Sequence, residues 1–434
     1  MIVLQLLWLA LLAAVLILLS TAPGLRRNYP YVWWCLLGYP VTVVRVRVTW
    51  RRLTTNLGLA VAKRPGRALL GDMVVRGDPL RPAPPRIGVP KLRRGGLDVT
   101  VRLHPGQVPD HFHSAVEALT HAWRVHAVRL ASDDRGFVTL SALAWDPLRT
   151  PVVPYQLKQR ALRAVVGLLE DGRAWAIDFR RAPHWLVVGA TRSGKSTLIA
   201  ALVKELAPQR VALFGIDLKG GMELSLFEDR LSALASTRTE AARLLAELVA
   251  EIEARMELCR TVGARSIWDL PAKLRKVPIV VIVDEVAELY LMATREDKAE
   301  VAEISTNLLR LAQLGAALGL HLVIAGQRVG SDLGPGVTAL RAQLAGRICH
   351  RVSDPGTAEM ALGDLNKDAL EAAQRITLAE QGVAITADTD GQWTRARSIH
   401  VTPDQARRTA TKYAHLAPAW PGLHVDEPTE GVYL

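Results

Sequence analysis

Short apolar runs alternate with amphipathic stretches over much of this chain. Five of the runs have the length and composition of buried strands: 184–188, 211–217, 278–283, 321–326 and 346–352. Between them, apolar side chains recur every three or four positions, from Leu244 to Cys259 and from Leu308 to Gly315, which predicts helices. Strands that alternate with helices indicate a parallel α/β sheet.

A smaller α+β pattern precedes this region. Alternating apolar and polar residues predict strands at 97–103, 125–130 and 136–143, and helical spacing predicts a helix over 110–124. Histidines are frequent here, but no cysteine accompanies them and no ligand spacing is recognisable, so they predict no metal site. One further helix is predicted at about 403–415, in the C-terminal tail.

The first fifty residues have the composition of a membrane anchor. Residues 1–19 contain Gln5 as the one strongly polar side chain and are long enough to cross a bilayer. A second apolar stretch, 29–44, is shorter and contains Pro40, so it fits either a second crossing or a re-entrant or interfacial segment. Arginines follow from Arg45 onward, which places the remainder in the cytoplasm.

We therefore predict a cell-membrane protein with a cytoplasmic catalytic region. A hairpin of two crossings is favoured over a single crossing, and a buried hydrophobic helix is the plainer alternative. Residues 51–96 are rich in proline and arginine, which predicts an extended linker. The predicted domains are an anchor (1–50), a linker (51–96), an α+β module (97–150), a motor (151–400) and a tail (401–434).

The overall charge bears on the partner. The chain has 434 residues, a formal net charge of +12 and an isoelectric point near 9.9, which favours a polyanionic partner. Its three cysteines form no C-x-x-C pair, so no disulfide framework is predicted.

Residues 189–197 fit the phosphate-binding pattern G-x-x-x-x-G-K-[ST] and lie between a predicted strand and a predicted helix. The glycines let the backbone N–H groups surround a polyphosphate, Lys195 reaches the β- and γ-phosphates, and the Ser196 hydroxyl ligates Mg²⁺. The sequence therefore predicts an ATP-binding loop that uses Mg²⁺, formed by Gly189, Ala190, Thr191, Arg192, Ser193, Gly194, Lys195, Ser196 and Thr197.

Polar residues at two other strand ends complete the predicted site. Asp284 and Glu285 follow the apolar run 278–283, and a parallel sheet would bring them beside the loop. Asp284 would hold Mg²⁺ through water, and Glu285 would polarise the attacking water. Gln327 follows the run 321–326 and suits a γ-phosphate sensor, although a plain turn residue is the alternative.

Several motifs resemble those of the FtsK/SpoIIIE DNA translocases, in order, over roughly 150–400. They are 184–196, 217–221, 281–285, 310–313, 319–322, 325–328 and 362–364. Within that family, residues 326–352 are most similar to the actinomycete conjugative-transfer branch, the TraSA- and TraB-like proteins. The resemblance implies a RecA-like motor fold, a homo-hexamer and movement of double-stranded DNA through its pore.

The chain also departs from that family. Residues 315–317 read Gly-Ala-Ala where many members have Gly-Arg-Ala, an arginine suspected of completing the neighbouring subunit's site. Arg310, Arg347 and Arg351 are the candidates to replace it, with surface arginines as the alternative. For DNA contact, the glycine-containing stretch from Arg328 to Arg341 suits a mobile pore loop, with an ordinary surface loop as the alternative.

Three functions fit the sequence. The favoured one is a membrane-anchored, ATP-driven translocase of double-stranded DNA in conjugative transfer or chromosome segregation, with other transfer or replication proteins as further partners. A protein-secretion ATPase is disfavoured because the sequence has one motor copy. A nucleotide-dependent DNA-binding adaptor is disfavoured because Lys195, Ser196, Asp284 and Glu285 are all present. The tail after Thr402 is too short for a winged-helix reader, so sequence-independent DNA binding is expected.

Overall fold

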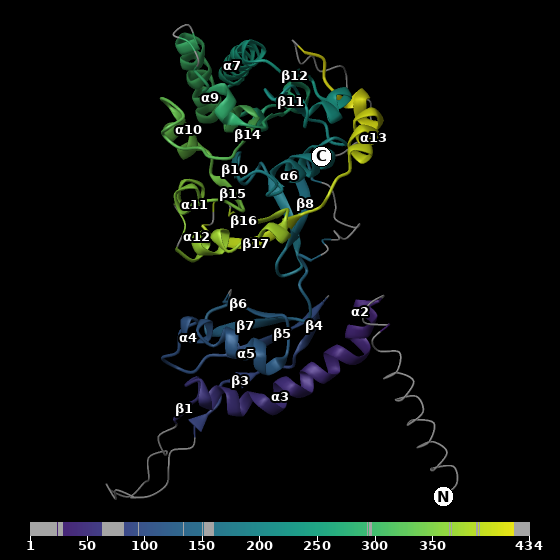
Figure 1. Cartoon of the computed structure of the whole chain (residues 1–434), viewed down its shortest axis with the longest axis vertical. Coiled ribbons are helices and arrows are strands. Elements are labelled where there is room, and N and C mark those ends of the chain that lie inside the picture. The colour runs from purple at the N-terminus through teal and green to yellow at the C-terminus, as the bar shows by residue number, and fades with distance from the viewer. Residues whose placement is uncertain are drawn as a thin grey trace, which may run out of the picture. The chain divides into compact units, whose positions relative to one another are not determined.

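The chain divides into two compact units, Met1–Arg149 and Thr150–Leu434. The computed structural model describes residues 24, 29–62, 82–93, 95–132, 134–149, 151, 160–292, 294, 297–363, 365, 367–387, 389 and 391–420. Figure 1 shows the elements of both units.

The first unit is built on an antiparallel sheet of five strands in the order β3-β5-β7-β6, with β4 also paired to β5. Leu97, Val99 and Val101 alternate along β5 and point into the core, as the sequence pattern predicts. The strands are β3 (Arg86–Ile87), β4 (Lys91–Arg93), β5 (Gly96–Arg102), β6 (Ala127–Ala131) and β7 (Phe137–Leu143), beside a pair made of β1 (Val61–Ala62) and β2 (Pro82–Ala83). The helices are α4 (Asp110–His113) and α5 (Val116–Trp123).

A long helical segment packs on this unit. It consists of α2 (Pro30–Trp33), a π-helical turn η1 (Trp34–Gly38) and α3 (Tyr39–Asn56). Trp34, Val46 and Trp50 are buried in the core of the unit. The Trp34 indole donates to the carbonyl of Gly96 at 3.0 Å, and the Trp50 indole donates to that of Pro85 at 2.8 Å.

This packing bears on the predicted membrane hairpin. Among the residues that the structure describes, no helix combines the length and the apolar character that a membrane crossing needs. Within the stretch 29–44, predicted as a second crossing or an interfacial segment, Trp34 is buried against the sheet and Trp33 packs beside it, while Val32, Leu36 and Val44 are exposed. The first predicted crossing, residues 1–19, lies outside the described residues.

The predicted linker also needs correction. Helix α3 continues to Asn56, and β3 and β4, which lie within 51–96, pair with β5. The prediction of an extended linker is wrong for these residues, because backbone pairing with β5 outweighs the local effect of the prolines. Residues 63–81 lie outside the described part of the chain.

The second unit contains a mixed sheet of ten strands in the order β12-β11-β13-β14-β10-β15-β16-β17-β8-β9. The strands from β12 to β15 in this order are parallel, and the remaining pairings are antiparallel. The five strands predicted from the sequence, β10, β11, β13, β14 and β15, all lie in the parallel part, so the predicted parallel sheet is confirmed for them; the sequence analysis did not predict the antiparallel strands that extend it. The strands are β8 (Arg163–Leu169), β9 (Ala174–Asp178), β10 (His184–Val188), β11 (Ala212–Ile216), β12 (Ala233–Ala235), β13 (Ile279–Val283), β14 (Leu320–Gly326), β15 (Gly346–His350), β16 (Val383–Ala387) and β17 (Trp393–Ser398).

Helices cover both faces of this sheet. Along β13, Val281 packs into one apolar core and Val280 and Ile282 into the other, which explains the unbroken apolar run. One face carries α7 (Arg238–Val262) and α9 (Asp297–Leu318), and the other carries α6 (Lys195–Leu206). The remaining helices are η2 (Ser225–Arg230), η3 (Ile267–Asp269), η4 (Ala272–Leu274), α8 (Val286–Leu289), α10 (Val337–Gln343), α11 (Pro355–Leu362), α12 (Lys367–Gln374), η5 (Leu378–Glu380), α13 (Pro403–Tyr413) and η6 (Ala414–Leu416).

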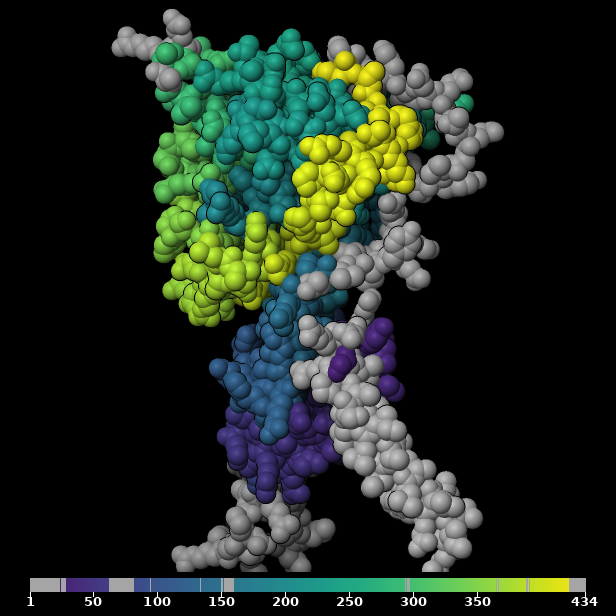
Figure 2. Space-filling model, turned by 45° about the vertical axis from the view of Figure 1, so that its right-hand side comes forward, coloured from purple at the N-terminus to yellow at the C-terminus, as the bar shows by residue number. Residues whose placement is uncertain are grey.

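The C-terminal helix belongs to this unit. Figure 2 shows α13, in yellow, lying on the surface of the unit. Ala406 and Ala410 are buried in the core that α6 covers, and Thr411 donates to Asp229 of η2 at 2.9 Å. The helix predicted at 403–415 is therefore part of the motor unit.

Candidate functional site

The phosphate-binding loop joins the end of β10 to the start of α6. Gly194 has φ +112° and Arg192 has φ +61°, so the backbone curls as a phosphate cradle requires. A Cβ at Gly194 would collide with the backbone of Gly382, whose N–H donates to the carbonyl of Ser193 at 2.9 Å. The turn before β16 therefore braces the loop, and the first N–H groups of α6 are left to face an anion.

The order of the strands brings the predicted catalytic residues together. Strand β14 lies between β13 and β10, and all three run parallel. Glu285 and Gln327 therefore emerge at the same sheet edge as the loop, and the N–H of Gln327 donates to Glu285 Oε1 at 3.1 Å. The N–H of Gly189 donates to the carbonyl of Gly326 at 3.2 Å.

Glu285 is held by two lysines. Its Oε2 accepts hydrogen bonds from Lys195 Nζ at 3.0 Å and from Lys219 Nζ at 3.3 Å, and its side chain is 5% exposed. Burial alone would raise the pKa of Glu285, but the two ammonium groups and the Gln327 N–H outweigh it and hold that pKa below its ordinary value. Glu285 is therefore ionised, as the predicted role of a general base requires.

Asp284 has a different environment. It is buried, and its Oδ1 has no hydrogen-bond partner among the described residues. Burial raises the pKa of Asp284, while the positive charge of Lys195 opposes the rise. An unpartnered buried carboxylate oxygen beside the start of α6, where Ser196 lies, fits a divalent cation. No group of three His, Cys, Asp or Glu side chains among the described residues could hold a metal, so phosphate oxygens would have to complete this site.

The sequence prediction did not include Lys219 among the site residues. The buried carboxylate of Asp217 accepts the N–H groups of Lys219, Glu223 and Leu224 at 3.3, 2.9 and 3.2 Å, which folds the loop after β11 back on itself. This fold carries Lys219 to Glu285. The motif 217–221 is part of the resemblance described above, but its sequence alone does not show where the Lys219 side chain points.

We expect Lys219→Ala to move the acid limb of the ATPase pH profile to higher pH. The mutation removes one of the cations that lower the pKa of Glu285, so Glu285 is protonated at a higher pH and the base is lost sooner. Measuring kcat against pH checks this, and Lys219→Arg, which keeps the charge, should retain most of the wild-type profile. An unchanged acid limb in Lys219→Ala would show that the contact does not tune Glu285.

The three arginine candidates occupy different places. Arg351 donates to the carbonyl of Thr191 at 3.2 Å, within the loop of its own chain. Arg347 is only 9% exposed and donates to the carbonyl of Arg341 at 3.2 Å. Arg310, on α9, is half exposed and forms an ion pair with Glu253 at 2.6 Å. Arg347 is buried and Arg351 is partly buried, so Arg310 is the most exposed of the three candidates.

The stretch predicted as a mobile DNA loop is partly helical. Helix α10 begins at Val337, and its Val337 and Leu340 are buried in the core shared with α9. Arg341 donates to the carbonyl of Val329 at 3.1 Å, and Arg328 pairs with Asp332 at 3.3 Å. The prediction of a mobile loop is wrong for 337–341, because Gly336, at φ +83°, begins a helix there.

Two family models match the chain. Residues 22–144 match the actinomycete conjugal transfer protein N-terminal domain, and residues 152–331 match the FtsK/SpoIIIE family. The division between the matches falls close to the division between the two units.

Individual relatives agree with the models. The transfer protein TraSA of Streptomyces ambofaciens is 40% identical over 396 residues, which cover 89% of this chain and 95% of the relative. A sporulation regulatory protein of Streptomyces azureus is 48% identical over 249 residues, 57% of this chain and 82% of the relative. DNA translocase FtsK of Streptococcus pneumoniae is 32% identical over 224 residues, which cover 47% of this chain and 28% of that protein.

Among solved structures, the pCW3 conjugation coupling protein TcpA, in its monomer form with ATPgS, has the same fold. It superposes with a TM-score of 0.57 at 20% identity, covering 85% of this chain and 98% of that one.

Proposed function

The chain is a P-loop ATPase that belongs to the FtsK/SpoIIIE family, in its actinomycete conjugal-transfer branch, and we propose that it uses ATP to move double-stranded DNA in conjugation. The observation that carries the proposal is the contact of Glu285 with Lys195, beside the unpartnered Oδ1 of Asp284, next to the phosphate loop. The transfer protein TraSA, which is similar over most of its length, supports the conjugative role.

We propose the following role for each residue of the site. Lys195 can turn from Glu285 toward the phosphates when ATP enters the loop, and Glu285 is then free to orient and deprotonate the attacking water. Gln327, tied to Glu285 through its backbone N–H, can report the state of the γ-phosphate to β14. Ser196 and Asp284 would hold Mg²⁺, which neutralises charge on the phosphates during transfer.

Two other functions are less well supported. A secretion ATPase would share the motor fold, but the match to a conjugal transfer N-terminal domain over 22–144 favours DNA as the cargo. A non-hydrolysing adaptor would have no need of a buried, ionised Glu285 beside the phosphate loop.

ATP turnover with different cargoes tests the proposal. Duplex DNA of any sequence should stimulate hydrolysis by the full-length protein in detergent, because phosphate contacts carry no sequence information. Neither unfolded polypeptide nor added deoxynucleoside monophosphates should stimulate ATP hydrolysis. If duplex DNA leaves the rate of ATP hydrolysis unchanged, or if polypeptide raises that rate instead, the protein is not a DNA motor.

We also propose that residues 1–19 anchor the protein in the cell membrane, with the motor in the cytoplasm. The apolar composition and length of this segment support the proposal. Full-length protein should stay in the membrane pellet after carbonate extraction. The double variant Leu7→Asp, Leu11→Asp should be released into the supernatant. Release of the wild-type chain would remove the anchor.

Subunits of a ring should complement one another. We propose a homo-hexamer in which an arginine of one subunit completes the ATP site of the next. Lys195→Ala and Arg310→Ala subunits should each be inactive alone, because one lacks the loop cation and the other the supplied arginine. Mixed in equal amounts, they should recover about a quarter of wild-type turnover, at interfaces where an intact loop meets an intact arginine.

The test compares the rate of ATP hydrolysis by the mixture with the rate of each variant alone. Arg351→Ala is the second partner to test, although its contact with Thr191 lies within its own chain. If neither arginine variant recovers activity with Lys195→Ala, neither residue completes a shared site.

A further inference from the structure

One face of the sheet in the first unit carries a row of exposed positive charge. Along β5, Leu97, Val99 and Val101 face the core, so Arg102 faces the other side. Arg86 of β3 and Phe137 of β7 lie directly opposite Arg102 in the register, and cross-strand partners share a face. The row Arg86–Arg102–Phe137 is exposed.

This face is basic along its length. Lys91, Arg93 and Arg129 lie on the same side of the sheet by register, and Asp98 is the one acidic residue of these strands on that side. Asp98 is already engaged by Arg93 at 3.6 Å and by the hydroxyl of Ser141 at 2.7 Å. It therefore cannot neutralise the row at Arg86 and Arg102.

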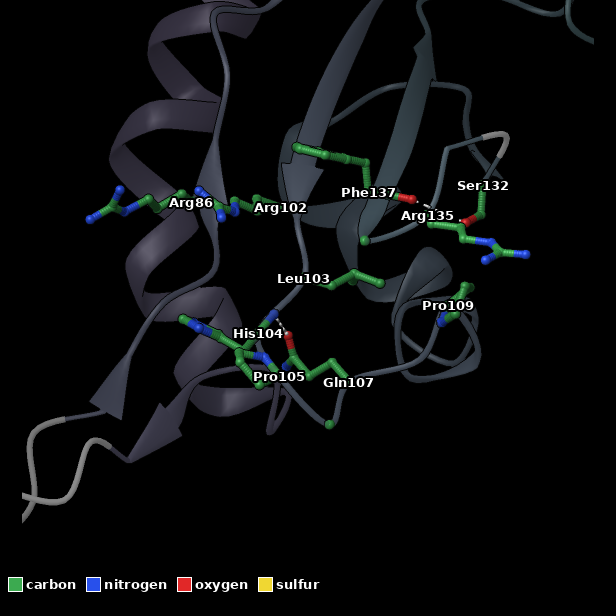
Figure 3. Close-up of a pocket in the computed structure, with 12 residues that line it drawn as sticks. Arg86, Arg102, Leu103, His104, Pro105, Gln107, Pro109, Ser132, Arg135 and Phe137 are labelled. Carbon is green, nitrogen blue, oxygen red and sulfur yellow. Dashed lines mark hydrogen bonds between the residues drawn. The ribbon is translucent and has the colours of Figure 1, made fainter.

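A hollow of about 870 Å³ opens beside the row. Residues 103–107, 109, 132, 135 and 136 complete it, and none of the described residues that line it is Asp or Glu. Figure 3 shows Arg86 and Arg102 on one side of the hollow and Arg135 on the other, with Phe137 between them. The three guanidinium groups do not converge on one point, so the arrangement suits an extended polyanion better than a single small anion.

Ion-pair partners for these arginines are not found in the described part of the chain. Within the described residues, no carboxylate forms an ion pair with Arg86, Arg102 or Arg135. Two like charges directly opposite on antiparallel strands repel each other and destabilise the sheet. A ligand that carries a chain of negative charges would relieve this repulsion.

We propose that this surface, defined by Arg86, Arg102 and Arg135, binds the phosphate backbone of duplex DNA outside the motor. The inference rests on the proposed function, since it takes DNA as the cargo. Arginine contacts to phosphate fix the position of a duplex without reading its sequence, which suits a motor that accepts any DNA. The first unit then holds the duplex independently of the ATP site.

A membrane surface is the competing polyanion, and the structure disfavours it here. The exposed side of the α2–α3 segment, which faces away from the sheet, carries Val32, Leu36, Val44 and Val48, exposed at 44%, 56%, 62% and 71%. An interfacial surface buries apolar side chains of this kind between acyl chains. The sheet face offers little besides Phe137 for that purpose.

Duplex binding by a triple variant tests the proposal. Arg86→Gln, Arg102→Gln and Arg135→Gln are combined in the full-length protein in detergent, without nucleotide, and a 30-bp duplex is titrated at several salt concentrations. Affinity at physiological salt should fall at least about tenfold, and the slope of log affinity against log salt should shrink by about 3 as three phosphate contacts are lost. The matched control combines Arg47→Gln, Arg51→Gln and Arg52→Gln, exposed arginines of α3, and should bind nearly as the wild type does.

The single variant Arg135→Gln, in a turn outside the strands, guards against misfolding and should reduce the slope by about 1. If the two triple variants lose duplex affinity equally, or if neither loses any, the inference is overturned while the proposed function stands. Unchanged duplex affinity together with lost binding to vesicles containing phosphatidylglycerol would overturn it in favour of a lipid surface. A wild-type protein that binds no duplex at all would instead remove the proposed function itself.

Discussion

Replacing Glu285 by Gln should leave ATP bound and slow its hydrolysis at least about 100-fold, the usual scale for losing a general base. The amide keeps the shape of the carboxylate and can still accept the N–H of Gln327, so the loop should keep its conformation. It cannot take a proton from water. The loss should therefore appear in turnover and not in nucleotide affinity.

Single-turnover hydrolysis and ATP binding by titration measure the two effects separately. The control is Glu288→Gln in α8, which removes a nearby carboxylate that forms no ion pair with Lys195 among the described residues and should keep normal turnover. If Glu285→Gln hydrolyses ATP at the wild-type rate, Glu285 is not the base and the assignment of the site fails.

Replacing Lys195 by Ala should lower ATP turnover about 1000-fold. This is the upper end of the range of rate losses seen when one group that stabilises a transition state is removed. The side chain is the one cation of the loop that is buried beside both Asp284 and Glu285 in the described structure. Its loss leaves the developing phosphate charge unneutralised and leaves Glu285 with Lys219 alone. ATP binding should weaken as well.

Lys204→Ala is the matched control, because Lys204 lies in the last turn of the same helix. It should hydrolyse ATP normally. Turnover by Lys195→Ala within tenfold of the wild type would be incompatible with a phosphate-binding role for this lysine.

The motor core was predictable because its strands are buried on both faces. An apolar run such as Ile279–Val283 has no room for polar residues, so its end, at Asp284, stands out in the sequence. Parallel pairing then forces the strand ends to one edge, which places Glu285 and Gln327 beside the loop. These positions follow from topology and need no knowledge of side-chain contacts.

Other features depend on contacts that no local pattern contains. Lys219 reaches Glu285 only because Asp217 folds the intervening loop. Residues 29–44 have the composition of a membrane segment, since a helix that packs tryptophans on a sheet is also rich in apolar residues. The antiparallel strands β16 and β17 extend the sheet past β15, and their short sequences gave no sign of direction.

The central claim is that ATP hydrolysis at this site moves duplex DNA, and displacement of a third strand measures it most directly. A labelled oligonucleotide forms a triplex near one end of a linear duplex, and the full-length protein in detergent is added with ATP and Mg²⁺. We predict release of the third strand that requires ATP and is absent with Glu285→Gln. Hydrolysis stimulated by the duplex with the triplex left in place would contradict the account.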